Sequence, residues 1–313
     1  MAQPSETFDT YDSIGEREDL SDVIYNISPT DTPFLSSAAK TQATAVLHEW
    51  QTDSLAAAVT NNAVIEGDEA TADAVTATTR LSNSSQILDK VVTITGTQEA
   101  VDKAGRASEI AYQIAKKAKE LKRDLESSLT SNNVEVTGSA SAARVLGGLG
   151  SWVATNDVFG SGGASGGLGN TARTNGTQRA FTEAQLKSVI KSVWNAGGNP
   201  QIIMVGPFNK QKLSGFTGNS TRFDAGADAT LYTSVDVYAS DFGQTQVIPN
   251  RFSRDRDAWV LDMDYWGVAF LRDFSMHELA KTGDTEKRQL LVECTLESRN
   301  EAASGLIADL TTS

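Results

Sequence analysis

The segment from residue 98 to residue 129, QEAVDKAGRASEIAYQIAKKAKELKRDLESSL, carries the clearest periodic pattern in the chain. Its apolar residues recur every three or four positions, at Ile110, Ile114, Ala118, Leu121 and Leu125. This spacing predicts one amphipathic helix over the whole segment, about 48 Å long at roughly 1.5 Å per residue. Most helices of globular domains are shorter than this.

The other face of this helix carries Lys116, Lys119 and Arg123, which fall on one stripe at about 100° per residue. Such a run is typical of a solvated face, stabilised by pairs such as Lys116 with Glu120. The alternative is that an acidic segment of a neighbouring subunit lies along the stripe.

Residues 45–95, before the helix, are rich in Thr, Val, Ala and Ser, with turn formers at 61–62 and 67–68. Val92 and Ile94 alternate with threonines, as in a half-buried strand. The pattern predicts a long two-stranded ribbon with an irregular tip. Because an isolated hairpin with few large apolar residues is marginal in water, this ribbon needs a partner surface.

The first part of the chain is strongly acidic. Residues 1–95 hold 15 acidic and 4 basic residues, whereas residues 96–313 hold 25 and 23, so most of the formal net charge of −13 lies at the front. Two interpretations stay open for the front segment: a solvated tail, or an arm that orders only against another subunit. Pro29 and Pro33 favour an extended chain there, and Phe34 with Leu35 supplies an apolar anchor. The acidic balance also disfavours general binding to nucleic acid.

Behind the helix, residues 131–180 are dominated by Gly, Ser, Ala, Thr and Asn, which favours a linker between two domains. Within them Trp152, Val153, Val158 and Phe159 indicate that part of the segment docks on something.

A second compact region begins at Phe181, where Thr182 and Gln185 form a capping box in front of a helix. The apolar face of this helix is Leu186, Val189, Ile190, Val193 and Trp194. The continuous apolar run 202–205 then predicts a strand buried on both faces. Further strands are expected at 235–238, 245–248, 259–263, 268–271 and 290–296. The fold class is therefore α+β.

Cysteine and hydropathy exclude several classes of protein. The single cysteine, Cys294, lies in an apolar run and is predicted to be buried; alone it excludes an intramolecular disulfide and a cysteine-based metal cluster. The first residues lack the basic and apolar regions of a secretory signal, and no run of 18 apolar residues exists, so we expect neither secretion nor a membrane span.

Catalytic motifs are nearly absent. Residues 163–167 fit the string Gly-x-Ser-x-Gly around Ser165, but they lie in a glycine tract without the strand-to-helix turn that gives this motif meaning. His48 and His277 are far apart in sequence and belong to no metal-spaced pair. We predict no catalytic, cofactor-binding or metal-binding residues.

One carboxylate pair is the best remaining candidate for a metal. Asp262 and Asp264 could supply oxygen ligands, but ion pairs with Arg254 and Arg256 are the simpler expectation.

The order of parts, together with five separated strings, carries a family resemblance. The strings are TFDTYD at 7–12, SPTDTPF at 28–34, QVIPNR at 246–251, YWGVA at 265–269 and ELAKTGD at 278–284. In this order the chain resembles the major capsid proteins of tailed bacteriophages with the Hong Kong 97-like fold, and the strings are similar to those of one subfamily, named after a podophage with an elongated head.

The resemblance implies a division of the chain. Residues 1–45 would be the N-terminal arm, 46–96 the extended loop, 97–180 the first part of the peripheral domain with its spine helix, 181–255 the axial domain, and 256–313 the return strands. It implies no enzyme activity and no cofactor. Copies would form the hexamers and pentamers of an icosahedral shell around a packaged double-stranded DNA genome.

The resemblance also implies partners. These are portal, separate scaffold and decoration proteins; DNA would be enclosed without sequence-specific binding, and no membrane would be involved. The location would be the virion, assembled in the host cytoplasm. Some relatives form a covalent Lys-to-Asn crosslink, but no residue set here assigns one. The alternatives are the shell of a non-viral nanocompartment, another virion structural protein, or a hydrolase using Ser165.

Overall fold

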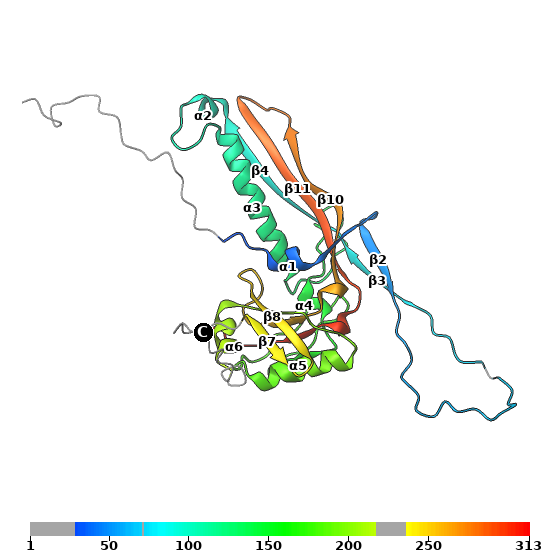
Figure 1. Ribbon diagram of the computed structural model, residues 1–313. Coiled ribbons are helices and arrows are strands. Elements are labelled where there is room, and N and C mark those ends of the chain that lie inside the picture. The colour runs from blue at the N-terminus through cyan, green and yellow to red at the C-terminus, as the bar shows by residue number, and fades with distance from the viewer. Residues whose placement is uncertain (1–28, 71, 217–235) are drawn as a thin grey trace, which may run out of the picture.

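Two β-sheets lie end to end in the molecule, and a long loop projects from their junction (Figure 1). The computed structural model describes residues 29–70, 72–216 and 236–313. A four-stranded sheet with one long helix forms one end, and a six-stranded sheet with shorter helices forms the other. The chain passes between the two sheets several times, so neither end is a continuous stretch of sequence.

The long helix, α3, runs from Glu109 to Leu129 and is shorter than predicted. The predicted segment breaks because α2, Gly96–Ala100, ends at Val101 and the chain then turns at Gly105, whose φ is +75°. Ser108 starts α3 anew by accepting a hydrogen bond from the amide of Ala111. A continuous periodic pattern therefore spans two helices, because local capping overrides it between residues 101 and 108.

The four-stranded sheet has the order β1, β10, β11, β4. Its strands are β1 (Ala39–Gln42), β4 (Gln86–Thr95), β10 (Trp266–Leu279) and β11 (Thr285–Ser298). The strands expected at 268–271 and 290–296 are confirmed but extend much further, to 14 residues each. Along β4 more buried and more exposed side chains alternate, as predicted for Val92 and Ile94, and Lys90 reaches Asp124 of α3 at 2.6 Å.

The six-stranded sheet has the order β5, β12, β9, β6, β8, β7. Its strands are β5 (Asp157–Val158), β6 (Ile202–Val205), β7 (Val237–Ser240), β8 (Gly243–Pro249), β9 (Ala258–Leu261) and β12 (Gly305–Ile307). The buried strand at 202–205 is confirmed and lies in the interior of the sheet. Of the strand expected at 235–238, residue 235 lies outside the described residues.

Helix α5, Glu183–Asn195, begins with the predicted capping box between Thr182 and Gln185. Phe181 and the apolar face pack on the six-stranded sheet, with α6, Pro207–Ser214, beside them. Trp194 is the exception: its side chain is 53% exposed and stacks on Phe242 instead of entering the core. It lies next to Val193 and so points off the buried stripe, which corrects the predicted face.

The glycine-rich segment is not a linker. Its short helix α4, Leu149–Trp152, is fully buried, and Trp152 and Val153 belong to the core as predicted. Gly169, with φ +77°, passes so close to Trp152 that a Cβ there would lie 2.7 Å from its ring. Phe159 is partly exposed, so the fully buried part of this segment does not include it. The composition reflects close backbone approach as well as flexibility.

One hydrophobic core joins the two sheets. It contains Phe34 of α1 (Pro33–Ser37), Leu125 of α3, Trp266 of β10, and Trp259 and Met204 of the six-stranded sheet. Cys294 lies in it and is fully buried as predicted, and this burial raises the pKa of its thiol to about 12. Two 3-10 turns, Met263–Tyr265 and Glu301–Ala303, connect the strands near this junction.

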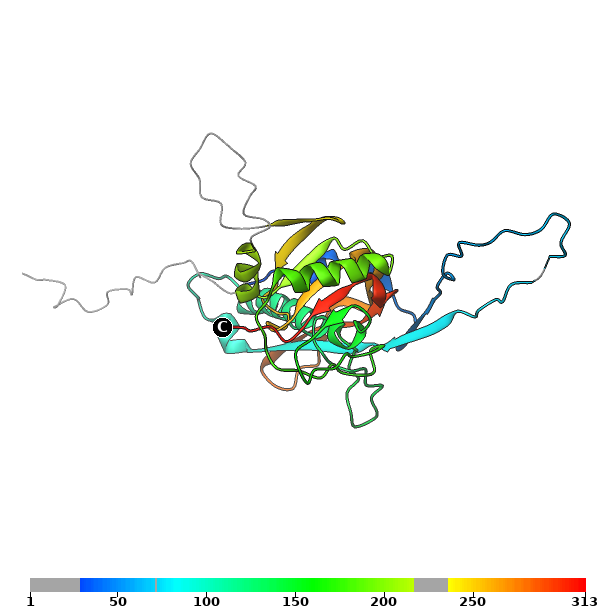
Figure 2. The ribbon, with the colours of Figure 1, turned by 90° about the horizontal axis from the view of Figure 1, so that it is seen from below.

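The predicted ribbon is much shorter than expected. Strands β2 (Leu47–Thr52) and β3 (Thr79–Ser84) pair over six positions, and β4 pairs with β11 instead of with the ribbon. The described residues between 53 and 78 form no strand. Figure 2 shows this loop standing clear of the body of the molecule.

Candidate intersubunit surfaces

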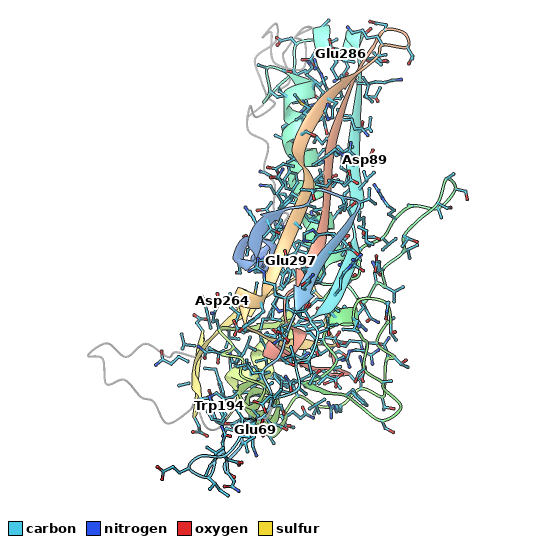
Figure 3. All side chains as sticks on the ribbon, turned by 90° about the vertical axis from the view of Figure 1, so that its right-hand side faces the viewer. Glu69, Asp89, Trp194, Asp264, Glu286 and Glu297 are labelled. Carbon is cyan, nitrogen blue, oxygen red and sulfur yellow. The ribbon has the colours of Figure 1, made fainter. Side chains whose placement is uncertain are left out.

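The outer part of the extended loop, residues 53–78, exposes apolar side chains that a protein working as a monomer would normally bury. Leu55 is 99% exposed and Val75 96%, and Val59, Val64 and Ile65 are almost as open. The loop carries five acidic residues and no lysine or arginine. Figure 3 shows Glu69 at its far end, opposite in the molecule to Glu286. An exposed strip that is both apolar and acidic fits a surface that another molecule covers.

The root of the loop is fixed to the body. Trp50 of β2 packs against Trp152 with ring centroids 5.5 Å apart, and its indole N–H donates to the carbonyl oxygen of Ser298 at 2.7 Å. His48 Nε2 lies 3.5 Å from Glu297, and Arg80 pairs with Glu49 across the hairpin. The loop is therefore held in place at its base, while its described residues, 53–70 and 72–78, are all exposed.

A buried carboxylate joins three distant segments. Glu126, in the last turns of α3, accepts hydrogen bonds from the amides of Phe34 and Leu35, both at 2.8 Å, and from Asn250 Nδ2 at 2.7 Å. Burial raises the pKa of this carboxyl, opposed by the three donors. Two of the quoted strings, SPTDTPF and QVIPNR, thus meet at Glu126. Sequence analysis missed this residue, because a glutamate in a charged amphipathic helix gives the pattern of a solvated side chain.

A groove of about 590 Å³ opens between α1, β1, β10 and α3. Its walls include Leu35, Phe270 and Phe274, and Lys40 and Lys122 stand at its edge. The Lys122 ammonium lies 5.8 Å from the centre of the Phe274 ring. The groove combines an aromatic lining with positive charge.

Only part of the predicted basic stripe, Lys116, Lys119 and Arg123, is open to solvent. Lys116 and Lys119 are exposed, but the Arg123 guanidinium stacks over Phe252 at 5.1 Å. The expected helix pair is wrong in detail, because Lys117 and not Lys116 binds Glu120, at 2.6 Å. Docking of an acidic segment on this stripe stays a prediction.

The residues singled out for chemistry do not come together. Among the described residues no group of three or more His, Cys, Asp or Glu side chains could hold a metal ion. His277 contacts Ser275, whereas His48 lies beside Glu297. Ser165 has no hydrogen bond to a histidine or a carboxylate in the part of the chain that the structure describes.

The expected ion pairs of the carboxylate pair are wrong. Asp262 caps the turn at 263–265 and accepts the amide of Asn199 at 2.9 Å, and Asp264 accepts from Gln201. The nearby arginines go elsewhere: Arg254 lies 3.2 Å from Asp257, and Arg256 lies 2.6 Å from Asp309. Turn geometry determines the partners of Asp262, since a capping aspartate is held by the backbone beside it.

Asp257 is the most perturbed carboxyl of this region. Burial raises its pKa to about 6, against the opposing effect of Arg254 and Arg173. Both carboxylate oxygens are buried without a hydrogen bond to a described residue. The ion pair of Arg254 with Asp257 is structural. It lies in a packed turn between the glycine-rich segment and the chain end, and not in a cleft with other reactive groups.

These parts are arranged in a fold that solved capsid structures share. The structure is similar to the capsid of cyanophage A-1(L), with a TM-score of 0.69 at 13% identity over 97% of this chain and 99% of that one. The holo-SrpI encapsulin complex from Synechococcus elongatus is also similar, with a TM-score of 0.54 at 14% identity over 93% and 94%.

Sequence comparison identifies the family of capsid proteins to which the chain belongs. The profile of the SU10 major capsid protein family matches residues 3–311. The major capsid protein of Escherichia phage Phieco32 is 30% identical, over 98% of this chain and 97% of that protein. The chain belongs to the SU10 major capsid protein family, which confirms the predicted fold class and the resemblance. No helix of the described residues is long and apolar enough to cross a membrane.

Proposed function

We propose that this chain is the shell-forming subunit of a tailed-phage head, a structural protein without enzyme activity. Copies form the hexamers and pentamers of an icosahedral shell around the packaged double-stranded DNA. In this assembly residues 1–45 act as the arm, 46–96 as the extended loop, 97–180 as the first part of the peripheral domain, 181–255 as the axial domain, and 256–313 as the return strands of both domains and the C-terminus.

The observation that carries the proposal is the extended loop. Its outer part, residues 53–78, holds five acidic residues and apolar side chains that are largely exposed, on a root that is firmly packed. Burying such side chains stabilises a contact by about 1.5–3 kcal/mol each, and a repeated contact accumulates over a closed assembly. A second copy of the chain is the partner that would be present in every particle to cover these side chains.

Further partners belong to the same proposal. Portal, scaffold and decoration proteins would join the shell, which assembles in the host cytoplasm. Enclosed DNA would be held without sequence-specific contacts, in keeping with the net charge of −13.

The test is electron microscopy of the purified chain. We expect closed shells or capsomers, and we expect a Leu55→Ser/Val75→Ser variant to stay folded but to assemble only at higher protein concentration. A matched control, Thr79→Ser in the paired strand β3, should assemble like the wild type. A stable 33 kDa monomer at every salt and protein concentration would overturn the proposal.

Similarity to an encapsulin favours a second candidate, the shell of a nanocompartment. Particles of this chain isolated from infected host cells separate the two functions. DNA inside the particles is the expected result, and particles filled with protein cargo alone would favour the nanocompartment.

A further inference from the structure

We propose that the groove between α1, β1, β10 and α3 is a docking site for residues 7–12, TFDTYD, of a neighbouring copy of this chain. The inference rests on the proposed function, since it needs neighbours. It assigns an occupant to the groove and a use to the string at residues 7–12.

The groove has the chemistry for an acidic aromatic segment. Phe270 and Phe274 line the groove, and Phe274 is 38% exposed although it is a large apolar side chain. Neither Lys40 nor Lys122 lies within ion-pair distance of any carboxylate of the described residues. The one acid of the groove, Asp273, already accepts the amide of Phe274 at 2.7 Å.

The walls of the groove are formed before any ligand arrives. Glu126 fixes the start of α1 through two backbone amides, and β1 pairs in parallel with β10 from Ala39 to Gln42. The amide of Ala43 donates to the carbonyl oxygen of Phe270 at 2.9 Å. Since these contacts already order the walls, binding would not incur the entropy of ordering them.

The segment TFDTYD matches the groove by its spacing. Phe8 and Tyr11 are three residues apart, and so are Asp9 and Asp12. In an extended polyproline-type conformation, with three residues per turn, the two aromatic rings share one edge and the two carboxylates share another. The rings could then contact the aromatic lining while the carboxylates meet the two lysines.

The geometry favours the arm of a neighbour over the chain's own arm. Residues 29–32 leave α1 on the side away from β1 and β10 (Figure 1). To enter its own groove the chain would have to turn back before residue 29, whereas an arm from another copy needs no such reversal.

Site-specific disulfide formation in assembled particles tests the docking. Cys294 is fully buried and does not compete. Particles are assembled from a mixture of full-length Thr10→Cys chains and tagged Gln42→Cys chains and then exposed to a mild oxidant. A disulfide forms only where the two Cα atoms come within about 7 Å. We expect a mixed dimer of twice the 33.3 kDa chain mass, identified by mass spectrometry.

Matched variants sharpen this result. Ser36→Cys, on the opposite wall, replaces Gln42→Cys if that variant does not assemble. Lys191→Cys on the exposed face of α5 is the control and should give no mixed dimer. The double reversal Lys40→Glu/Lys122→Glu should lower the crosslink yield by about two- to thirty-fold, the effect of losing two exposed ion pairs. Lys191→Glu should leave the yield unchanged.

The other outcomes are decisive as well. Particles that form without a mixed dimer overturn the inference and leave the proposed function intact. A crosslink that appears only when both cysteines are on one chain assigns the groove to the chain's own arm and overturns the choice of a neighbour. If charge reversal lowers the DNA content of particles that never crosslink, DNA occupies the groove. Failure of the wild-type chain to form any particle contradicts the proposed function instead.

Discussion

The junction of the two sheets and the extended loop belong to the same chain but follow opposite rules. At the junction, Leu125, Trp152 and Trp266 are fully buried, and the buried Glu126 has three hydrogen-bond donors. In the loop, Leu55 and Val75 have almost their whole side chains in solvent. The difference shows which residues fold the subunit and which ones only another subunit can use.

The strongest test of this comparison is a cavity at the junction. Leu125→Ala removes a fully buried side chain from the core shared by both sheets, so the free energy of unfolding should fall by about 2–5 kcal/mol. Denaturant unfolding of the unassembled protein measures the change. A loss no larger than that of an alanine substitution in the loop would show that the two regions do not differ as described.

The next largest effect is expected at the buried carboxylate. Glu126→Ala leaves two amides of α1 without an acceptor and leaves Asn250 Nδ2 with only the weak acceptor Met204 Sδ, which should cost about 2–6 kcal/mol of unfolding free energy. Glu126→Gln keeps one carbonyl acceptor and should cost clearly less. If both variants unfold like the wild type, α1 is not held by this residue.

Asp257 gives a pH-dependent test of the body of the subunit. Its raised pKa means that, between about 4 and 6, the folded state keeps a proton that the unfolded state has lost. The stabilisation from this proton is fully present below the unfolded pKa and is lost as the pH rises through about 6.

The stability of the wild type relative to Asp257→Asn should therefore fall by about 1–3 kcal/mol between pH 4 and pH 7. Denaturant titrations of the two proteins at several pH values measure it. A difference that rises with pH would mean that the arginines, and not burial, dominate the titration.

The smallest effect on folding is expected in the loop. Leu55→Ala should change the free energy of unfolding by less than about 0.5 kcal/mol, because the side chain has no buried contact to lose. The same variant should raise the protein concentration at which particles appear in light scattering. Equal effects on folding and assembly would contradict the separation of the two regions.

Local signals in the sequence predicted local structure well. The capping box at Thr182 and Gln185, the buried strand at 202–205 and the burial of Cys294 are all confirmed, because neighbouring residues determine them. The ribbon and the long helix were too long in the prediction. Strand β4 pairs with β11, which comes from the other end of the chain, and periodicity alone cannot show such a partner.

The candidate surfaces were only partly predictable. The need of the loop for a partner follows from its composition, whereas the groove is built from α1, β1, β10 and α3, which are far apart in sequence. Glu126 is the clearest case, because its role depends on two amides about 90 positions earlier and on an amide side chain 124 positions later. No pattern within α3 distinguishes it from its solvated neighbours.

The uninterrupted core beneath the two sheets makes the subunit body stiff. Tilting one sheet against the other would expose tryptophan and leucine side chains and open voids, at a strain energy of several kcal/mol. A closed shell nevertheless has to change its curvature between rings of five and rings of six. The body can therefore act only as a rigid wedge, and the compliance of the shell falls to segments such as the extended loop, whose backbone can rotate without uncovering any core.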